Sequence, residues 1–161
     1  MSKIAPCLWF DGEAEEAARF YVSLLPDSRI DNVHRNVSDS PAGKEGTVLI
    51  VAFTLAGQRF LALNGGRRFE YTHAVSFAID CDDQAEVDRL WETLCAGGGA
   101  PEQCGWLKDR YGVSWQIVPK VVPAMLADPD KAKAQRAMAA VMGMVKIDIA
   151  AVQAAFEGKA A

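Results

Sequence analysis

Residues 104–119 read CGWLKDRYGVSWQIVP, and this stretch says most about the fold. A short apolar segment around 104–108 and a longer one over 113–118 flank Tyr111-Gly112, a pair typical of a tight turn. The pattern predicts a short strand, a turn and a stronger strand. Because side chains alternate along a strand, Gln116 shares one face with Ser114 and Val118.

Upstream of this hairpin the sequence predicts a strand and a helix. Residues 74–79 form an apolar run typical of a strand. A helix is predicted from Asp82-Asp83 to the stop at Gly97-Gly98-Gly99, and Asp83 with Glu86 three residues later suits an N-cap with its reciprocal partner. Residues 72–119 are therefore expected to form a βαβββ module.

The same order of elements is predicted in residues 1–64, which makes a first βαβββ module. Its expected elements are a strand over 4–10, a helix over 13–25 and strands over 29–37, 47–55 and 58–64, with a polar loop at 38–46 and a hairpin turn at Ala56-Gly57. This repeated order predicts the α+β class, with two modules in residues 1–122.

The character of the chain changes after Pro119. Residues 123–127, 131–144 and 149–156 are rich in alanine and methionine and poor in β-branched residues, which favours helices. An apolar stripe runs through Ala137, Val141 and Met144-Val145. We expect residues 123–161 to form a helical extension that packs on the body or on a second subunit.

The composition excludes several classes of partner. The net charge is −4, and nucleic acids and anionic membranes both require a concentrated basic patch. No apolar run approaches the ~20 residues that span a bilayer. The N-terminus lacks a secretory pattern and the four cysteines form no Cys-x-x-Cys pair, so we expect a cytoplasmic protein with free thiols.

Two segments carry a resemblance to a known family. Residues 8–12 (LWFDG), 14–17 (AEEA) and Phe20-Tyr21 resemble the opening of the PhnB-like proteins, and residues 104–119 resemble their second signature. The resemblance implies the vicinal-oxygen-chelate superfamily, with glyoxalase I, extradiol dioxygenases and bleomycin-resistance proteins. It implies curled mixed sheets around a cleft, a homodimer and a small-molecule ligand.

The resemblance also implies where a metal would lie. Superfamily enzymes place ligands on the first, fourth, fifth and eighth strands, typically histidine, glutamate or glutamine. The matching positions here are Pro6 or Leu8, Asn64, His73 and Gln116. One histidine and two amides fall short of the donors that a divalent transition metal needs, so no metal or other cofactor is predicted. A bound divalent metal is the alternative.

Six residues are candidates for ligand contact: Gln116, His73, Asn64, Trp106, Trp9 and Cys104. Gln116 is the foremost of them, because the resemblance places its strand face toward the cleft. His73 is either a cleft base or an ordinary histidine at the start of a strand. Cys104 is either an exposed sulfur or a buried thiol, and the tryptophans are either core or cleft wall. Asp109 and Arg110 are expected to be a surface or turn pair, and substrate anchoring by Lys108-Asp109 is the alternative.

These observations leave several functions open, and the catalytic residues, if any, are not identified by the sequence. The leading prediction is a protein that binds a small organic ligand without metal, and whether it is an enzyme is left open. The alternatives are a metal-dependent lyase, isomerase or dioxygenase using His73 and Gln116, and an interaction protein acting through the helical tail. Relatives often carry the name 3-demethylubiquinone 3-methyltransferase. That activity ranks below the others, because Asp11-Gly12-Glu13 is not a glycine-rich cofactor turn.

Overall fold

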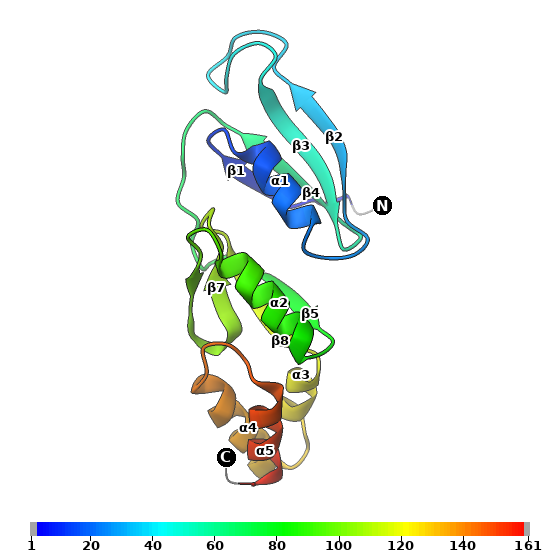
Figure 1. Ribbon diagram of the computed structural model, residues 1–161, viewed down its shortest axis with the longest axis vertical. Helices are drawn as coiled ribbons and strands as arrows, with labels where there is room; N and C mark the ends of the chain where they lie inside the picture. Colours follow the sequence, from blue (N-terminus) through cyan, green and yellow to red (C-terminus); the bar gives the residue numbers. More distant parts are fainter. Residues whose placement is uncertain (1–2, 160–161) are drawn as a thin grey trace. The chain divides into compact units, whose positions relative to one another are not determined.

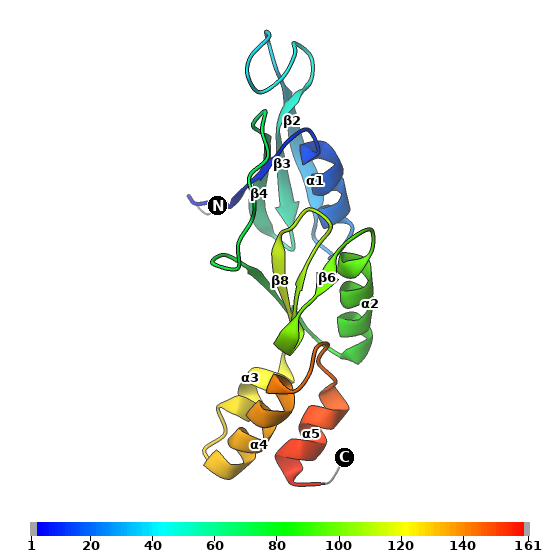
Figure 2. The same ribbon diagram turned by 90° about the vertical axis from the view of Figure 1, so that its left-hand side faces the viewer.

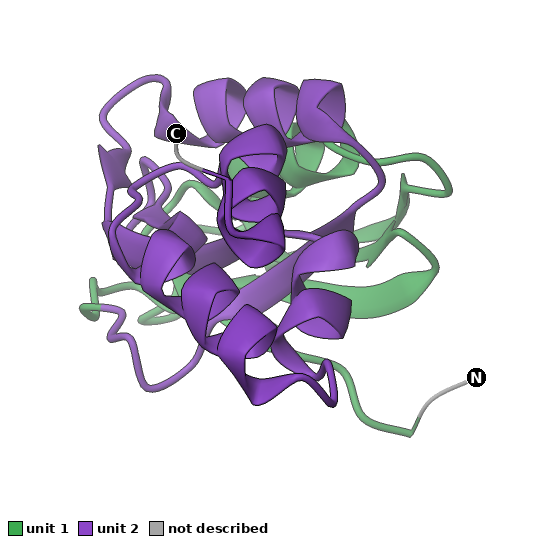
Figure 3. Cartoon of the chain, turned by 90° about the horizontal axis from the view of Figure 1, so that it is seen from below, with its two compact units in different colours: residues 1–70 green, residues 71–161 purple. Residues whose placement is uncertain are grey.

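The computed structural model describes residues 3–159 of the chain. The chain divides into two compact units, residues 1–70 and residues 71–161 (Figure 3). Each unit contains a mixed four-stranded sheet with one helix packed on it, and the second unit also holds the C-terminal helices. The predicted α+β class with two βαβββ modules and a helical tail is confirmed.

The first unit forms a sheet with the strand order β1-β4-β3-β2. Its elements are β1 (Cys7–Phe10), α1 (Ala14–Val22), β2 (Arg29–Arg35), β3 (Val48–Leu55) and β4 (Gln58–Asn64) (Figure 1). β1 pairs with β4 in parallel, and the other pairs are antiparallel. The β3–β4 turn is Ala56-Gly57, as predicted, and both residues have a positive φ, which suits a two-residue hairpin.

The core of the first unit lies between α1 and one face of its sheet. Alternate residues of β3 and β4 are buried there: Val51, Phe53, Leu55, Phe60 and Ala62. Tyr21 of α1 stacks on Phe53, with ring centroids 6.2 Å apart. Because side chains alternate, the residues between these point to the opposite face of the sheet, which we call the open face of the first sheet.

The second unit repeats the plan with the strand order β5-β8-β7-β6. Its elements are β5 (Phe77–Cys81), α2 (Gln84–Cys95), β6 (Ala100–Pro101), a 3₁₀ turn (Gln103–Gly105), β7 (Trp106–Lys108) and β8 (Ser114–Pro119). Helix α2 lies along one side of this sheet (Figure 2). It buries Val87, Leu90 and Leu94 in a core with Trp115 and Ile117.

The predicted helix cap is confirmed, and two strand predictions need correction. Asp83 accepts a hydrogen bond from the Glu86 backbone N–H at 2.9 Å. β5 begins at Phe77 instead of residue 74, because the Thr72 hydroxyl accepts the N–H of Ala74 and forms a turn there. The two-residue strand β6 is too short for a periodic signal, and no strand was predicted at its position.

Asp109 begins the turn, since its carbonyl accepts the Gly112 N–H at 2.9 Å, but the expectation that it lies at the surface is wrong. Asp109 is 2% exposed. Its Oδ1 accepts hydrogen bonds from the backbone N–H groups of Tyr111 and Val113, and its Oδ2 accepts one from the Trp115 indole at 2.9 Å. The carboxylate therefore holds together both the turn and the strand that follows it. Arg110 is exposed, as expected.

The helical tail consists of α3 (Val121–Leu126), α4 (Lys131–Met142) and α5 (Ile149–Glu157). Its own apolar cluster contains Val122, Ala137, Val141, Ile147 and Val152, with Met144 packed against it. Ala137, Val141 and Met144 of the predicted stripe thus face the core, whereas Val145 is 41% exposed. Within residues 3–159, no helix is long and apolar enough to cross a bilayer.

The tail is attached to the second sheet through backbone and side-chain hydrogen bonds. The N–H groups of Cys104 and Gly105 donate to the carbonyls of Met144 and Val145, both at 2.8 Å. The Gln84 side chain of α2 donates to the Ile147 carbonyl and accepts from the Ile149 N–H. These contacts make the tail part of the second unit.

Candidate functional site

One face of the second sheet is not covered by α2, and we call it the open face of the second sheet. Strand register places Ala78, Gln116 and Trp106 side by side across β5, β8 and β7. The Glu102 N–H donates to the Trp106 carbonyl at 2.8 Å, which extends this row by one residue beyond β6. Because Leu107, Trp115 and Ile117 point to the core, the residues of the row point away from α2.

Gln116 lies at the centre of this row and is half-buried. Its Nε2 donates to the Ser76 hydroxyl at 2.9 Å, which fixes the orientation of the amide. Within residues 3–159, no hydrogen bond reaches the amide oxygen Oε1. Gln116 therefore offers a fixed, vacant acceptor on the open face.

His73 and Glu102 form a pair at the edge of the same row. Nε2 of His73 lies 2.7 Å from Oε2 of Glu102, and their side chains are 53% and 28% exposed. The imidazole ring also lies against Trp106, with ring centroids 6.3 Å apart. The structure thus brings together three of the predicted residues, Gln116, His73 and Trp106, in one unit.

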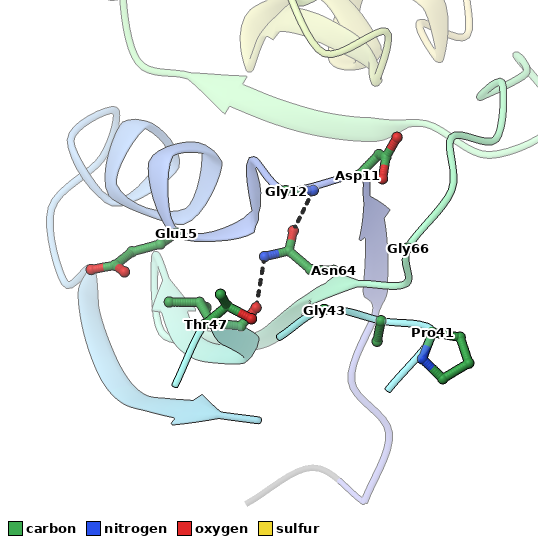
Figure 4. A pocket seen from close by; sticks show the side chains of 10 residues that line it. Asp11, Gly12, Glu15, Pro41, Gly43, Thr47, Asn64 and Gly66 are labelled. Atoms are coloured by element: carbon green, nitrogen blue, oxygen red, sulfur yellow. Dashed lines mark hydrogen bonds between the residues drawn. The ribbon is translucent and has the colours of Figure 1, made fainter. Parts of the chain in front are cut away.

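Asn64 and Trp9 lie in the first unit, and both have structural partners. Oδ1 of Asn64 accepts the N–H groups of Gly12 and Ala14 at 3.0 Å, and its Nδ2 donates to the Val48 carbonyl. Figure 4 shows this amide between the β1–α1 turn and β3, in the wall of a cavity of about 550 Å³. Asn64 fixes the start of α1 relative to the sheet.

The Trp9 indole anchors the connector that follows β4. Its N–H donates to the Arg67 carbonyl at 2.7 Å, and Phe69 packs edge-on against the ring. A Cβ at Gly65 would lie 1.7 Å from the Trp9 ring, so only glycine allows the connector to pass this close.

Cys104 lies against the helical tail and not in the row. Its backbone is in the left-handed region with φ at 60°, and its Sγ lies 3.6 Å from Sδ of Met142. Burial raises the pKa of the thiols of Cys7 and Cys95, and it raises the pKa of Cys81 to about 12. These three thiols are therefore protonated at neutral pH and poorly suited to act as nucleophiles.

The comparisons with known proteins agree with this architecture. Residues 2–118 match the family model described as 3-demethylubiquinone-9 3-methyltransferase. A PhnB protein from Bacillus cereus is 38% identical, with a TM-score of 0.67 over 73% of this chain and 99% of the other. The chain belongs to this PhnB-like family of the vicinal-oxygen-chelate superfamily.

Two more distant structures share the fold of this PhnB-like chain. Protein PA1353 from Pseudomonas aeruginosa is 21% identical, with a TM-score of 0.55 over 74% of this chain and 98% of the other. The fosfomycin resistance protein FosX from Mesorhizobium loti is 15% identical, with a TM-score of 0.51 over 80% and 100% of the two chains. No curated protein matches the sequence. The family match ends at residue 118, so the helices α3–α5 lie beyond it.

Of the four metal positions that the superfamily implies, only His73 carries an ordinary metal donor in this PhnB-like chain. Leu8 is apolar and buried in the core of the first unit. The oxygen of Asn64 already accepts two backbone N–H groups, and Gln116 offers only a neutral amide oxygen. Among residues 3–159, no three His, Cys, Asp or Glu side chains cluster closely enough to hold a metal ion. The residues present do not fit the metal.

Sequence reasoning missed two residues of this site in the PhnB-like chain: Glu102, a member of the row, and Ser76, which holds the Gln116 amide. Ser76 lies within the strand predicted over 74–79, but the sequence does not show that this residue lies beside Gln116. Glu102 joins the row through the β6–β7 pairing, which a two-residue strand does not reveal in the sequence.

Proposed function

We propose that this chain binds a small planar organic ligand on the open face of the second sheet, without a metal. The observation that carries the proposal is the vacant acceptor Oε1 of Gln116, held by Ser76 beside the half-buried Trp106 indole. A fixed polar atom next to an aromatic surface is the arrangement with which binding sites orient flat ligands.

The neighbours of Gln116 define which ligand would fit. Ala78 on one side is exposed and small, which leaves room for a ring above β5. Trp106 on the other side offers its indole as a wall. Because Oε1 can only accept a hydrogen bond, the ligand should carry a hydroxyl or N–H group.

The test compares two neutral probes that differ in one hydroxyl group, 2-naphthol and naphthalene. Wild-type protein should bind 2-naphthol about fivefold to tenfold more tightly, since one hydrogen bond is worth about 1 kcal/mol. Gln116→Leu should abolish this preference. Trp106→Ala should lower the affinity for both probes about tenfold, because the aromatic wall is lost. Probe fluorescence gives both affinities.

A matched control comes from the first unit, where Phe69 is a 47% exposed aromatic residue. Phe69→Ala should leave the affinity for both probes unchanged. Equal binding of the two probes by wild type, or a preference that survives in Gln116→Leu, would rule out the proposed acceptor role.

A metal-dependent lyase, isomerase or dioxygenase is the second candidate, and the His73–Glu102 pair favours it. Imidazole and carboxylate are both ordinary metal donors, but further donors would have to come from a second copy of the chain. Elemental analysis of protein purified without chelator or affinity tag tests whether the protein holds a metal. Stoichiometric metal that is lost in His73→Ala would support the metal-dependent enzyme. A protein that holds no metal and takes up neither Zn²⁺ nor Mn²⁺ would exclude the metal-dependent enzyme.

The methyltransferase activity in the family description ranks below both candidates. The turn between β1 and α1 is Asp11-Gly12-Glu13, and the sheets are mixed and four-stranded. A methyltransferase of the usual kind has a glycine-rich turn within a larger α/β sheet. Calorimetric binding of S-adenosylmethionine would reverse this ranking.

The homodimer remains a prediction, for which light scattering is the test.

A further inference from the structure

A second cavity, of about 480 Å³, lies on the first unit and is lined by residues of β2, β3 and β4. The residues that matter for its chemistry are Arg29, Asp31, His34, Ala52, Thr54 and Arg59. None of them belongs to the site proposed above, so the inference that follows does not rest on that function.

At one end of this cavity, side chains from three adjacent strands of the first sheet lie side by side. Thr54 of β3 is paired with Arg29 of β2 on one side and with Arg59 of β4 on the other. Two guanidinium groups are therefore placed at the same end of the sheet, on either side of a hydroxyl group.

The single carboxylate in the cavity is already engaged. Oδ1 of Asp31 lies 2.9 Å from Nε of Arg29, and its Oδ2 accepts the Thr54 hydroxyl at 2.7 Å. No ion pair or hydrogen bond within residues 3–159 engages the Arg59 guanidinium. The cavity therefore has one positive charge in excess, at Arg59, with the His34 imidazole also in its wall.

The neighbouring part of the sheet is apolar. Ala52, in the cavity wall, is paired with Leu61 of β4, and both side chains are half-buried on the open face of the first sheet. The charged end of the cavity thus lies close to one apolar lining side chain, Ala52, which is continuous with Leu61 on the sheet.

We propose that this cavity binds a small organic carboxylate, with its anionic group on Arg59 and its apolar body over Ala52. The guanidinium presents a planar fork of donors that matches a carboxylate. The Arg29–Asp31 pair is neutral overall and keeps a second donor close to the anion. A cavity of about 480 Å³ fits a single aromatic ring with its acid group.

The test uses benzoate and its neutral analogue benzamide, titrated into ¹⁵N-labelled full-length protein and followed by NMR. Benzoate should shift the amide signals of residues 29–34 and 52–59, and benzamide should bind at least about tenfold more weakly, since charge-assisted hydrogen bonds are the stronger ones. Arg59→Gln should reduce benzoate affinity about tenfold and leave benzamide affinity unchanged.

The matched control is Arg19→Gln, which removes the same charge from α1 of the same unit, where Arg19 pairs with Glu15. This variant should bind benzoate as the wild type does. Equal affinity for benzoate and benzamide, unchanged benzoate affinity in Arg59→Gln, or shifts confined to residues outside 29–34 and 52–59 would each overturn the proposal.

Discussion

His73 and Glu102 are 29 positions apart in the sequence, yet Nε2 of the histidine lies 2.7 Å from Oε2 of the glutamate. The contact links the segment before β5 with the segment after β6. It stands beside Trp106 and completes the row that contains Gln116. The pair thus sets the edge of the surface that we propose as the ligand site.

This pair should contribute little to stability. Both side chains are partly exposed, and exposed ion pairs are worth about 0–1 kcal/mol. Glu102→Ala and His73→Ala should each lower the free energy of unfolding in urea by less than about 1 kcal/mol. The double variant should lose no more than the sum of the two. A loss above about 2 kcal/mol in either single variant would mean that the pair belongs to the structural core.

Asp109 should behave in the opposite way, because its carboxylate is buried and accepts hydrogen bonds from two backbone groups and from Trp115. Asp109→Ala leaves these donors buried without a partner and should cost about 3 kcal/mol or more in urea unfolding. Asp80→Ala, at an exposed position of β5, is the control and should change stability by less than about 0.5 kcal/mol. A small effect of Asp109→Ala would show that water replaces the carboxylate.

Ser114 provides a case where removing a polar group should not harm the fold. Its side chain is 1% exposed, and its Oγ has no hydrogen-bond partner within residues 3–159. Because a buried hydroxyl without a partner is unfavourable, Ser114→Ala should be neutral or stabilising by up to about 1 kcal/mol. Thermal unfolding measures the difference. Destabilisation by more than about 1 kcal/mol would reveal a hydrogen bond to a bound water molecule.

Cys81 should make stability fall at alkaline pH. Burial, followed by the charge of Glu86, raises its pKa from 9.0 to about 12 in the folded protein. The unfolded chain therefore releases the thiol proton first, and the stabilising contribution that is complete below pH 9 is lost between pH 9 and about 12. Cys81→Ala should show a shallower loss of stability over this range in urea unfolding. Identical slopes would mean that the thiol ionises equally in both states.

Gln84 should be the main side-chain link between α2 and the tail. Its amide bonds the Ile147 carbonyl and the Ile149 N–H, at the start of α5. Gln84→Ala should speed amide hydrogen exchange at 147–152 by about tenfold, since two hydrogen bonds that hold this segment are lost. Gln153→Ala, on the exposed face of α5, is the control. Equal exchange in both variants would show that the Gln84 amide does not hold this segment.

The order of the elements, apart from β6, could be predicted from the sequence, because turns, caps and side-chain periodicity are local signals. The Ala56-Gly57 hairpin, the Asp83 cap and the three tail helices all follow from residues within a few positions of one another. The βαβββ repeat could be read for the same reason.

Which side chains meet could not be predicted from the sequence. Strand alternation turns Asn64 toward α1, and the backbone N–H groups of Gly12 and Ala14 occupy its oxygen. Asp109 begins a turn, as expected, but it is buried and its carboxylate accepts a hydrogen bond from the Trp115 indole. Glu102 reaches His73 only because β6 pairs with β7. The strand register, the face of the sheet to which a side chain points and the burial of that side chain depend on contacts between distant segments. Local sequence patterns do not contain this information.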